Sequence, residues 1–201
     1  MNVYVESNFV LELALLQEQS TSCEEILGLG ETSGVQLVVP AYSLAEPYET
    51  LTRRQRQRKR LKEELDAELR QIARTATYAE RLDGFRDVTA LLMNIGDEES
   101  KRLEEVCSRL TKAAEVIPLD ASVLSASTQY QRIHGFAPQD ALVYSTVLSH
   151  LEQARATRSC FLNRNSRDFD DQTVVEQLER YNCKLLPRFD SGSHFILNAL
   201  R

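Results

Sequence analysis

The chain begins with Met1-Asn2-Val3-Tyr4-Val5-Glu6-Ser7-Asn8, in which strand-forming residues lead directly to an acidic turn. The run from Val3 to Val5 predicts a short buried strand, and apolar residues at helical spacing start at Phe9. Glu6 is therefore expected at the carboxyl end of a strand, the edge at which open parallel sheets bind ligands. Ser7 and Asn8 are the expected helix caps, so capping does not require the Glu6 carboxylate.

The composition is that of a globular protein, with 201 residues of which 42% are hydrophobic and 27% charged. We expect one domain over residues 1–201 and a cytoplasmic location, because the sequence contains no apolar run of about 20 residues and no signal-peptide pattern. The four cysteines and three histidines are widely separated in the sequence. This spacing favours buried reduced thiols and gives little support to a zinc site or a histidine-dependent triad.

The pattern of strand followed by helix recurs along the chain. A short helix is expected from Ser22 to Leu29, stopped by Gly28 and Gly30. The apolar run from Gln36 to Val39, which Pro40 ends, predicts the next strand, and Glu46 follows this strand. Further strands are expected at residues 116–119 and 160–162, each followed by polar residues. Such alternation predicts a parallel sheet covered on both faces. Glu6, Glu46 and Asp168 would then share one edge of the sheet.

Two further acids lie at the starts of predicted helices. Asp140 follows Pro138 in the first turn of a largely apolar helix, which places it near the positive end of the helix dipole. Dipole complementation alone would explain this position, but the apolar character of the helix favours an acid that faces a cleft. Asp120 is interpreted as an N-cap of a helix that Gly135 ends.

Residues 47–113 contain only helix-forming sequence, which predicts an inserted helical hairpin or subdomain over about 49–113. Three apolar stripes indicate helices, and Gly96 followed by acidic residues predicts a stop and a new start. The stretch from Thr52 to Arg60 contains no apolar residue, and its cations are Arg53, Arg54, Arg56, Arg58, Lys59 and Arg60. It is expected to project into solvent or to meet an anionic partner. The alternative is a solvated face, in which Glu63, Glu64, Asp66 and Glu68 pair with basic residues at helical spacing in the same helix or in a neighbouring one.

The acidic edge resembles that of the PIN-domain nucleases. The matching segments are Val3 to Asn8, Ser43 with Glu46, Gln139 to Leu142, and Asn163 to Phe169, in that order. The resemblance covers about residues 1–48 and 114–190. It implies a three-layer α/β/α fold with a central parallel sheet, and a metal-dependent nuclease, usually acting on RNA. Many relatives are toxins of toxin-antitoxin pairs, whereas others process or degrade RNA.

The expected site consists of Glu6, Glu46, Asp140 and Asp168, as catalytic residues and ligands of Mg²⁺ or Mn²⁺. Such hard cations prefer oxygen ligands, activate water and neutralise a scissile phosphate. Glu46 could instead orient water. The expected supporting donors around the ligands are Ser7, Asn8, Ser43, Asn163 and Asn165. An acidic crevice without metal is the alternative.

Two classes of function follow. The first is a metal-dependent ribonuclease whose basic stretch holds the RNA backbone. The second is a catalytically weak or inactive PIN-like module that binds RNA or a protein partner, because Asn165 carries an amide where many relatives carry a carboxylate. RNA is the expected partner, with an antitoxin, another protein or a second copy of the chain as alternatives, and no membrane is expected.

Overall fold

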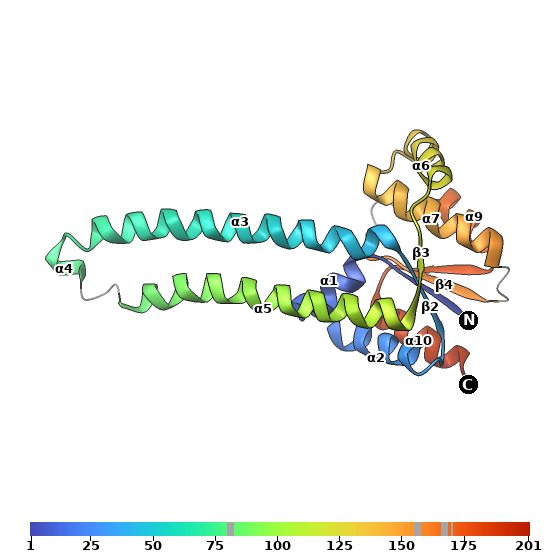
Figure 1. Cartoon of the computed structure of the whole chain (residues 1–201), viewed down its shortest axis with the longest axis horizontal. Coiled ribbons are helices and arrows are strands. Elements are labelled where there is room, and N and C mark those ends of the chain that lie inside the picture. Colours follow the sequence, from blue (N-terminus) through green and yellow to red (C-terminus); the bar gives the residue numbers. More distant parts are fainter. Residues whose placement is uncertain (80–82, 155–157, 166–168, 170) are drawn as a thin grey trace.

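The computed structural model describes the chain except for residues 80–82, 155–157, 166–168 and 170. Its centre is a sheet of five parallel strands in the order β3-β2-β1-β4-β5 (Figure 1). The strands are β1 Asn2–Val5, β2 Gln36–Pro40, β3 Ala114–Ile117, β4 Ser159–Leu162 and β5 Cys183–Leu186. The predicted parallel sheet is confirmed, with β1 in its middle.

Helices connect the strands and cover both faces of the sheet. They are α1 Ser7–Leu15, α2 Ser20–Glu31, α3 Ala41–Ile72, α4 Ala76–Ala79, α5 Asp83–Ala113, α6 Ala121–His134, α7 Pro138–Ala154, α9 Gln172–Glu179 and α10 Phe189–Ala199. Since successive side chains of a strand point to opposite faces, each strand contributes to two cores. The structure is therefore the expected three-layer α/β/α arrangement with additional helices.

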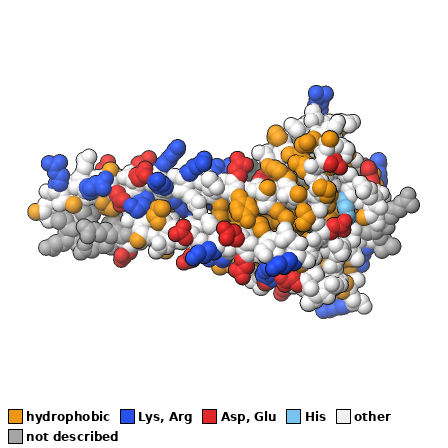
Figure 2. All heavy atoms as spheres, in the orientation of Figure 1, with side chains coloured by type: hydrophobic (Ala, Val, Ile, Leu, Met, Phe, Trp, Pro, Cys, Tyr) orange, Lys and Arg blue, Asp and Glu red, His pale blue; other side chains and the backbone are white. Residues whose placement is uncertain are grey.

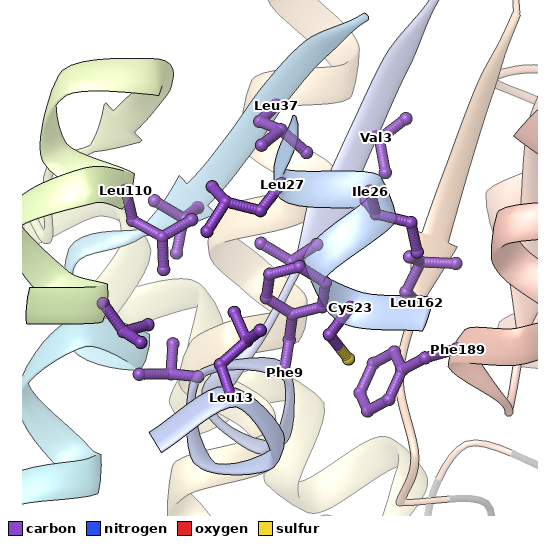
Figure 3. Packing of buried hydrophobic residues seen from close by; sticks show 14 of the residues in the cluster. Val3, Phe9, Leu13, Cys23, Ile26, Leu27, Leu37, Leu110, Leu162 and Phe189 are labelled. Atoms are coloured by element: carbon purple, nitrogen blue, oxygen red, sulfur yellow. The ribbon is translucent and has the colours of Figure 1, made fainter. Parts of the chain in front are cut away.

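The first core lies between the sheet and helices α1, α2, α5 and α10 (Figure 3). Val3 and Val5 of β1 point into it, and Phe9 of α1 packs edge-to-face on Phe189 of α10 with ring centroids 5.5 Å apart. Gly30 of α2 is part of this packing, because a Cβ atom there would lie 2.2 Å from Leu37 Cδ1. A glycine therefore allows α2 to approach β2 closely.

The second core lies on the opposite face, against α7 and α9. Tyr4, between the two valines of β1, belongs to it, as does Phe161 of β4. Phe136, Tyr144 and Phe169 form a contiguous aromatic cluster in this core, with ring centroids 5.0 to 5.8 Å apart. This packing positions α7, whose first turn carries Asp140.

Helices α3 and α5 form a long antiparallel hairpin that projects from the sheet, with α4 at its tip (Figure 1). At its base, Leu103 and Leu110 of α5 are fully buried in the first core. Arg109 of α5 also binds Glu24 and Glu31 of α2. The part of the hairpin next to the sheet is thus held by both apolar and ionic contacts.

Several predicted boundaries were wrong. Helix α2 begins at Ser20 and continues through Gly28 and Gly30, and α5 continues through the predicted stop at Gly96. Favourable packing of the other side chains outweighs the modest cost of glycine within a helix. Strand β3 begins at Ala114 rather than Val116, and β5 and α10 were not predicted.

None of the helices in the described part of the chain is long and apolar enough to cross a membrane. All four cysteines are buried free thiols, as predicted.

Candidate functional site

The candidate site lies where β1 and β4 end side by side. Val5 pairs with Leu162 in the parallel register, so Glu6 and Asn163 leave the sheet at neighbouring positions. The chain continues from β1 toward β2 on one side, and it later enters β4 on the other side of β1. Such a change of direction leaves a crevice at the carboxyl ends of the strands.

Glu6 is the N-cap of α1. Its Oε2 accepts a hydrogen bond from the backbone N–H of Asn8 at 2.8 Å, and its Oε1 accepts one from the backbone N–H of Arg164 at 3.5 Å. The prediction that Ser7 or Asn8 would cap this helix was therefore wrong, because the longer Glu6 side chain folds back onto the first turn. Burial raises the pKa of the Glu6 carboxyl to about 7, with repulsion from Glu46 adding to the effect and hydrogen bonds from Asn8 and Arg164 opposing it.

Glu46 reaches the same place from α3. The hydroxyl group of Ser7, which is buried, donates a short hydrogen bond to Glu46 Oε2. Helix α3 starts directly after β2, so its second turn stands over the carboxyl end of β1. The structure thus places the Glu6 and Glu46 carboxyl groups beside each other.

Asp140 enters the site from the first turn of α7. Its Oδ1 accepts a hydrogen bond from Asn165 Nδ2 at 3.0 Å. The backbone N–H of Asn165 in turn donates to Oδ1 of the buried Asn163 at 2.8 Å. A chain of hydrogen bonds and adjacent residues therefore connects Glu46, Glu6, the 163–165 loop and Asp140.

The remaining predicted residues have different positions. Asp168 lies outside the described residues. Ser43 is fully buried in α3, and its Oγ has no hydrogen-bond partner among the described residues. Asp120 is the exposed N-cap of α6 and accepts a hydrogen bond from Val123 N at 2.9 Å, as predicted.

Tyr42 is a residue of the site that sequence reasoning missed. It is half-buried one turn before Glu46, and its pKa is raised by burial and then by the charges of Glu46, Glu49 and Asp140. Its phenol therefore lies within the field of acids from both α3 and α7. The available signal was its spacing of four residues from Glu46 on the same helix face.

A buried ionic network supports the 163–165 loop and was also missed. Arg164 forms an ion pair with Glu12 of α1, whose side chain is 0% exposed. Glu12 also accepts a hydrogen bond from Gln19 N at 3.0 Å, and Gln19 Oε1 accepts one from Phe189 N at 2.7 Å. These bonds fix the loop between α1 and the start of α10. In the sequence, the position of the acidic Glu12 within an otherwise apolar helix is the signal that could have indicated this buried ionic network.

The basic residues lie on α3, beyond Glu46. The stretch was expected to project into solvent or to meet an anionic partner, but Arg58 instead pairs with Glu99 of α5 through two hydrogen bonds. Lys62 pairs with Asp66, so one of the nearby acids does bind a cation at helical spacing.

The donor chemistry of the site fits a hard divalent cation. Glu6, Glu46 and Asp140 supply carboxylate oxygens, and Asn163 supplies an amide oxygen. A cation would also relieve the repulsion between Glu6 and Glu46. Within the described residues, however, no group of three His, Cys, Asp or Glu side chains could hold a metal ion. The carboxylates instead accept hydrogen bonds from Ser7, Asn8 and Asn165.

Comparison with known proteins agrees with this geometry. A family model described as the PIN domain matches residues 3–169. A search of curated proteins finds no match to the chain.

Proposed function

The chain belongs to the PIN-domain family, a family of nucleases, and we propose that it is an endoribonuclease that hydrolyses RNA phosphodiester bonds with Mg²⁺ or Mn²⁺. The observation that carries the proposal is the hydrogen-bonded set of acids at the carboxyl ends of β1 and β4. These acids come from three separate parts of the chain, Glu6 after β1, Glu46 on α3 and Asp140 on α7. Stability alone does not favour carboxyl groups gathered in this way.

Each acid has a proposed role. Glu6 and Asp140 hold the cation, Glu46 is a further ligand or orients the attacking water, and Asp168 completes the set. A bound divalent cation would supply an activated water and would neutralise charge on the scissile phosphate. Ser7 and Asn165 hold Glu46 and Asp140 in position through their hydrogen bonds, and Asn163 orients Asn165.

One observation favours a second candidate, a catalytically weak or inactive PIN-like module that binds RNA or a protein partner. The Asn165 amide, rather than a carboxylate, lies against Asp140. An amide provides one neutral oxygen where a carboxylate would provide a charged ligand, so the affinity for a divalent cation would be lower.

A nuclease assay separates the two candidates. The parent protein and an Asp140→Asn variant are incubated with mixed-sequence single-stranded RNA in Mg²⁺, in Mn²⁺ and in EDTA. The proposal predicts cleavage by the parent in one or both metals and none in EDTA or by the variant. Asp120→Asn is the matched control, because it makes the same chemical change at an exposed helix cap that asparagine also supports.

The control should cleave like the parent. No cleavage by a folded parent in either metal would reject the ribonuclease and leave the second candidate. Equal cleavage by the folded Asp140→Asn variant would remove Asp140 from the proposed site.

A further inference from the structure

The cations of α3 divide into different classes according to the helix face on which they lie. Arg58 faces α5, where its Nη2 donates to Glu99 Oε1 at 2.9 Å and its Nη1 to Glu99 Oε2 at 2.5 Å. The Glu99 side chain is only 7% exposed. Arg58 is therefore part of the contact between the two helices and is not available to a ligand.

Arg53, Arg56 and Arg60 are exposed. Helical spacing places their Cα atoms opposite that of Arg58, although the Arg56 side chain also borders the hollow between α3 and α5. Their spacing of three and four residues aligns them in one stripe. Together with Glu49, Thr52 and Gln57 they line a surface groove of about 480 Å³. Within the part of the chain that the structure describes, none of these three arginines forms an ion pair. Figure 2 shows Lys and Arg side chains along the hairpin, interspersed with acids.

The stripe is aligned with the candidate site. The members of this helix face alternate at spacings of four and three residues: Tyr42, Glu46, Glu49, Arg53, Arg56 and Arg60. Because α3 is one continuous helix, Arg53 lies about 10 Å and Arg60 about 21 Å along the helix axis from Glu46. Figure 1 shows α3 starting at the sheet and running outward. The cations thus extend outward from the acidic site.

We propose that this face of α3 binds the phosphodiester backbone of single-stranded RNA, with Arg53, Arg56 and Arg60 contacting successive parts of the strand that reaches Glu46. The identification of the bound nucleic acid as RNA rests on the proposed function. Guanidinium groups bind phosphate oxygens through paired hydrogen bonds, which suits arginine to this role.

The lining of the groove favours RNA over a protein partner. Protein interfaces contain a desolvated core rich in aromatic and other apolar side chains. None of the six residues that line this groove is apolar. Glu49, at the end nearest the acidic site, limits the positive field to the outer part of the stripe.

The test measures binding without cleavage, in the whole 201-residue chain carrying Asp140→Asn. The probe is a labelled mixed-sequence single-stranded RNA, and affinity is measured over a salt series. A triple variant changes Arg53, Arg56 and Arg60 to Gln. Three lost phosphate contacts should reduce the slope of log affinity against log salt by about 2, and should lower affinity about 10- to 100-fold at moderate salt.

The matched control is Arg70→Gln, Arg74→Gln and Lys101→Gln, which removes the same charge from exposed positions outside the groove. It should keep the parent slope. Arg58→Gln should also keep the slope, since Arg58 is bound to Glu99. Equal effects of the two triple variants would mean that only the net charge of the protein affects RNA binding. This result would overturn the assignment of RNA binding to the stripe.

The proposal would also be overturned if the variant lacking Arg53, Arg56 and Arg60 bound RNA with the affinity and the salt dependence of the parent. A changed oligomeric state together with such unchanged binding would assign this face to a second copy of the chain. RNA binding is measured separately from cleavage. A protein that binds RNA through the stripe but does not cleave it would therefore contradict the proposed ribonuclease activity and support the proposed RNA-binding stripe.

Discussion

Asn165 donates a hydrogen bond from its side-chain Nδ2 to Asp140 Oδ1 across 3.0 Å. Asn165→Asp would replace this bond with two adjacent carboxyl groups. Without a divalent cation, we expect the free energy of unfolding to fall by about 1–3 kcal/mol, because a donor is lost and two like charges meet. With excess Mg²⁺, the added carboxylate becomes a further oxygen ligand, so the loss should shrink or reverse.

Urea unfolding in EDTA and in Mg²⁺ measures this difference. Asn94→Asp is the control, since Asn94 is exposed on α5 and its replacement should show no Mg²⁺ dependence. The same loss for Asn165→Asp in EDTA and in Mg²⁺ would argue against a cation at Asp140.

The pKa of Glu6, raised from 4.5 to about 7, makes the stability of the protein depend on pH. Folding favours the neutral carboxyl group, so its stabilising effect is fully present below about pH 4.5 and is lost as the pH rises toward 7. The loss is on the order of 3 kcal/mol. Glu6→Gln should therefore be more stable than the parent above neutral pH and similar to it in mild acid.

Denaturant unfolding in EDTA across this range provides the measurement. Gln keeps a side-chain oxygen for the Asn8 N–H, so the helix cap is retained. A stability difference between parent and variant that does not vary with pH would contradict the raised pKa of Glu6.

Strands β1, β2 and β4 could be predicted because each is a short, largely apolar run that a polar residue or Pro40 closes. Helix boundaries were less predictable wherever tertiary packing outweighed local preference. Gly30 illustrates this, because its lack of a side chain allows α2 to contact Leu37 of β2. The hydrophobic pattern could not reveal β5, whose exposed Lys184 interrupts the apolar run.

The acids of the site could be selected because each follows a strand or starts a helix. The hydrogen bonds that connect these acids could not be predicted from the sequence, because they join distant parts of the chain. The bond from Ser7 to Glu46 and the bond from Asn165 to Asp140 depend on how α3 and α7 cross the sheet edge. From composition alone, Arg58 was expected to face solvent or an anionic partner such as RNA, whereas its partner Glu99 lies on the other helix of the hairpin.

Glu12 gives a test of the network that holds the 163–165 loop. Its side chain is 0% exposed, accepts a hydrogen bond from Gln19 N and forms an ion pair with Arg164. Glu12→Ala leaves a buried N–H without its acceptor and creates a cavity, so unfolding should become easier by about 2–4 kcal/mol. Glu18→Ala is the control, because Glu18 contacts the same arginine but its side chain is 82% exposed.

The Glu18 variant should differ from the parent by no more than about 0.5 kcal/mol. Urea unfolding compares the two directly. If Glu12→Ala lowered the free energy of unfolding as little as Glu18→Ala, the contacts of Glu12 with Arg164 and Gln19 would contribute little to the stability of the loop.

Arg58 and Glu99 allow the contact between the hairpin helices to be measured. Arg58→Ala would leave the Glu99 carboxylate, with its side chain 7% exposed, without its cation, and should lower the free energy of unfolding by about 1–3 kcal/mol. Lys62→Ala is a matched control on the same helix, because its pair with Asp66 has side chains 34% and 30% exposed and should contribute at most about 0.5 kcal/mol.

A double variant, Arg58→Met with Glu99→Leu, distinguishes the worth of the ion pair from the cost of an unpaired charge. It should be more stable than Arg58→Ala alone, because apolar side chains of similar size can replace a half-buried ion pair without leaving an unpaired charge. Hydrogen exchange should show faster local opening of α3 and α5 in Arg58→Ala and near-parental protection in the double variant. A double variant as unstable as Arg58→Ala would mean that α3 and α5 require the ion pair itself.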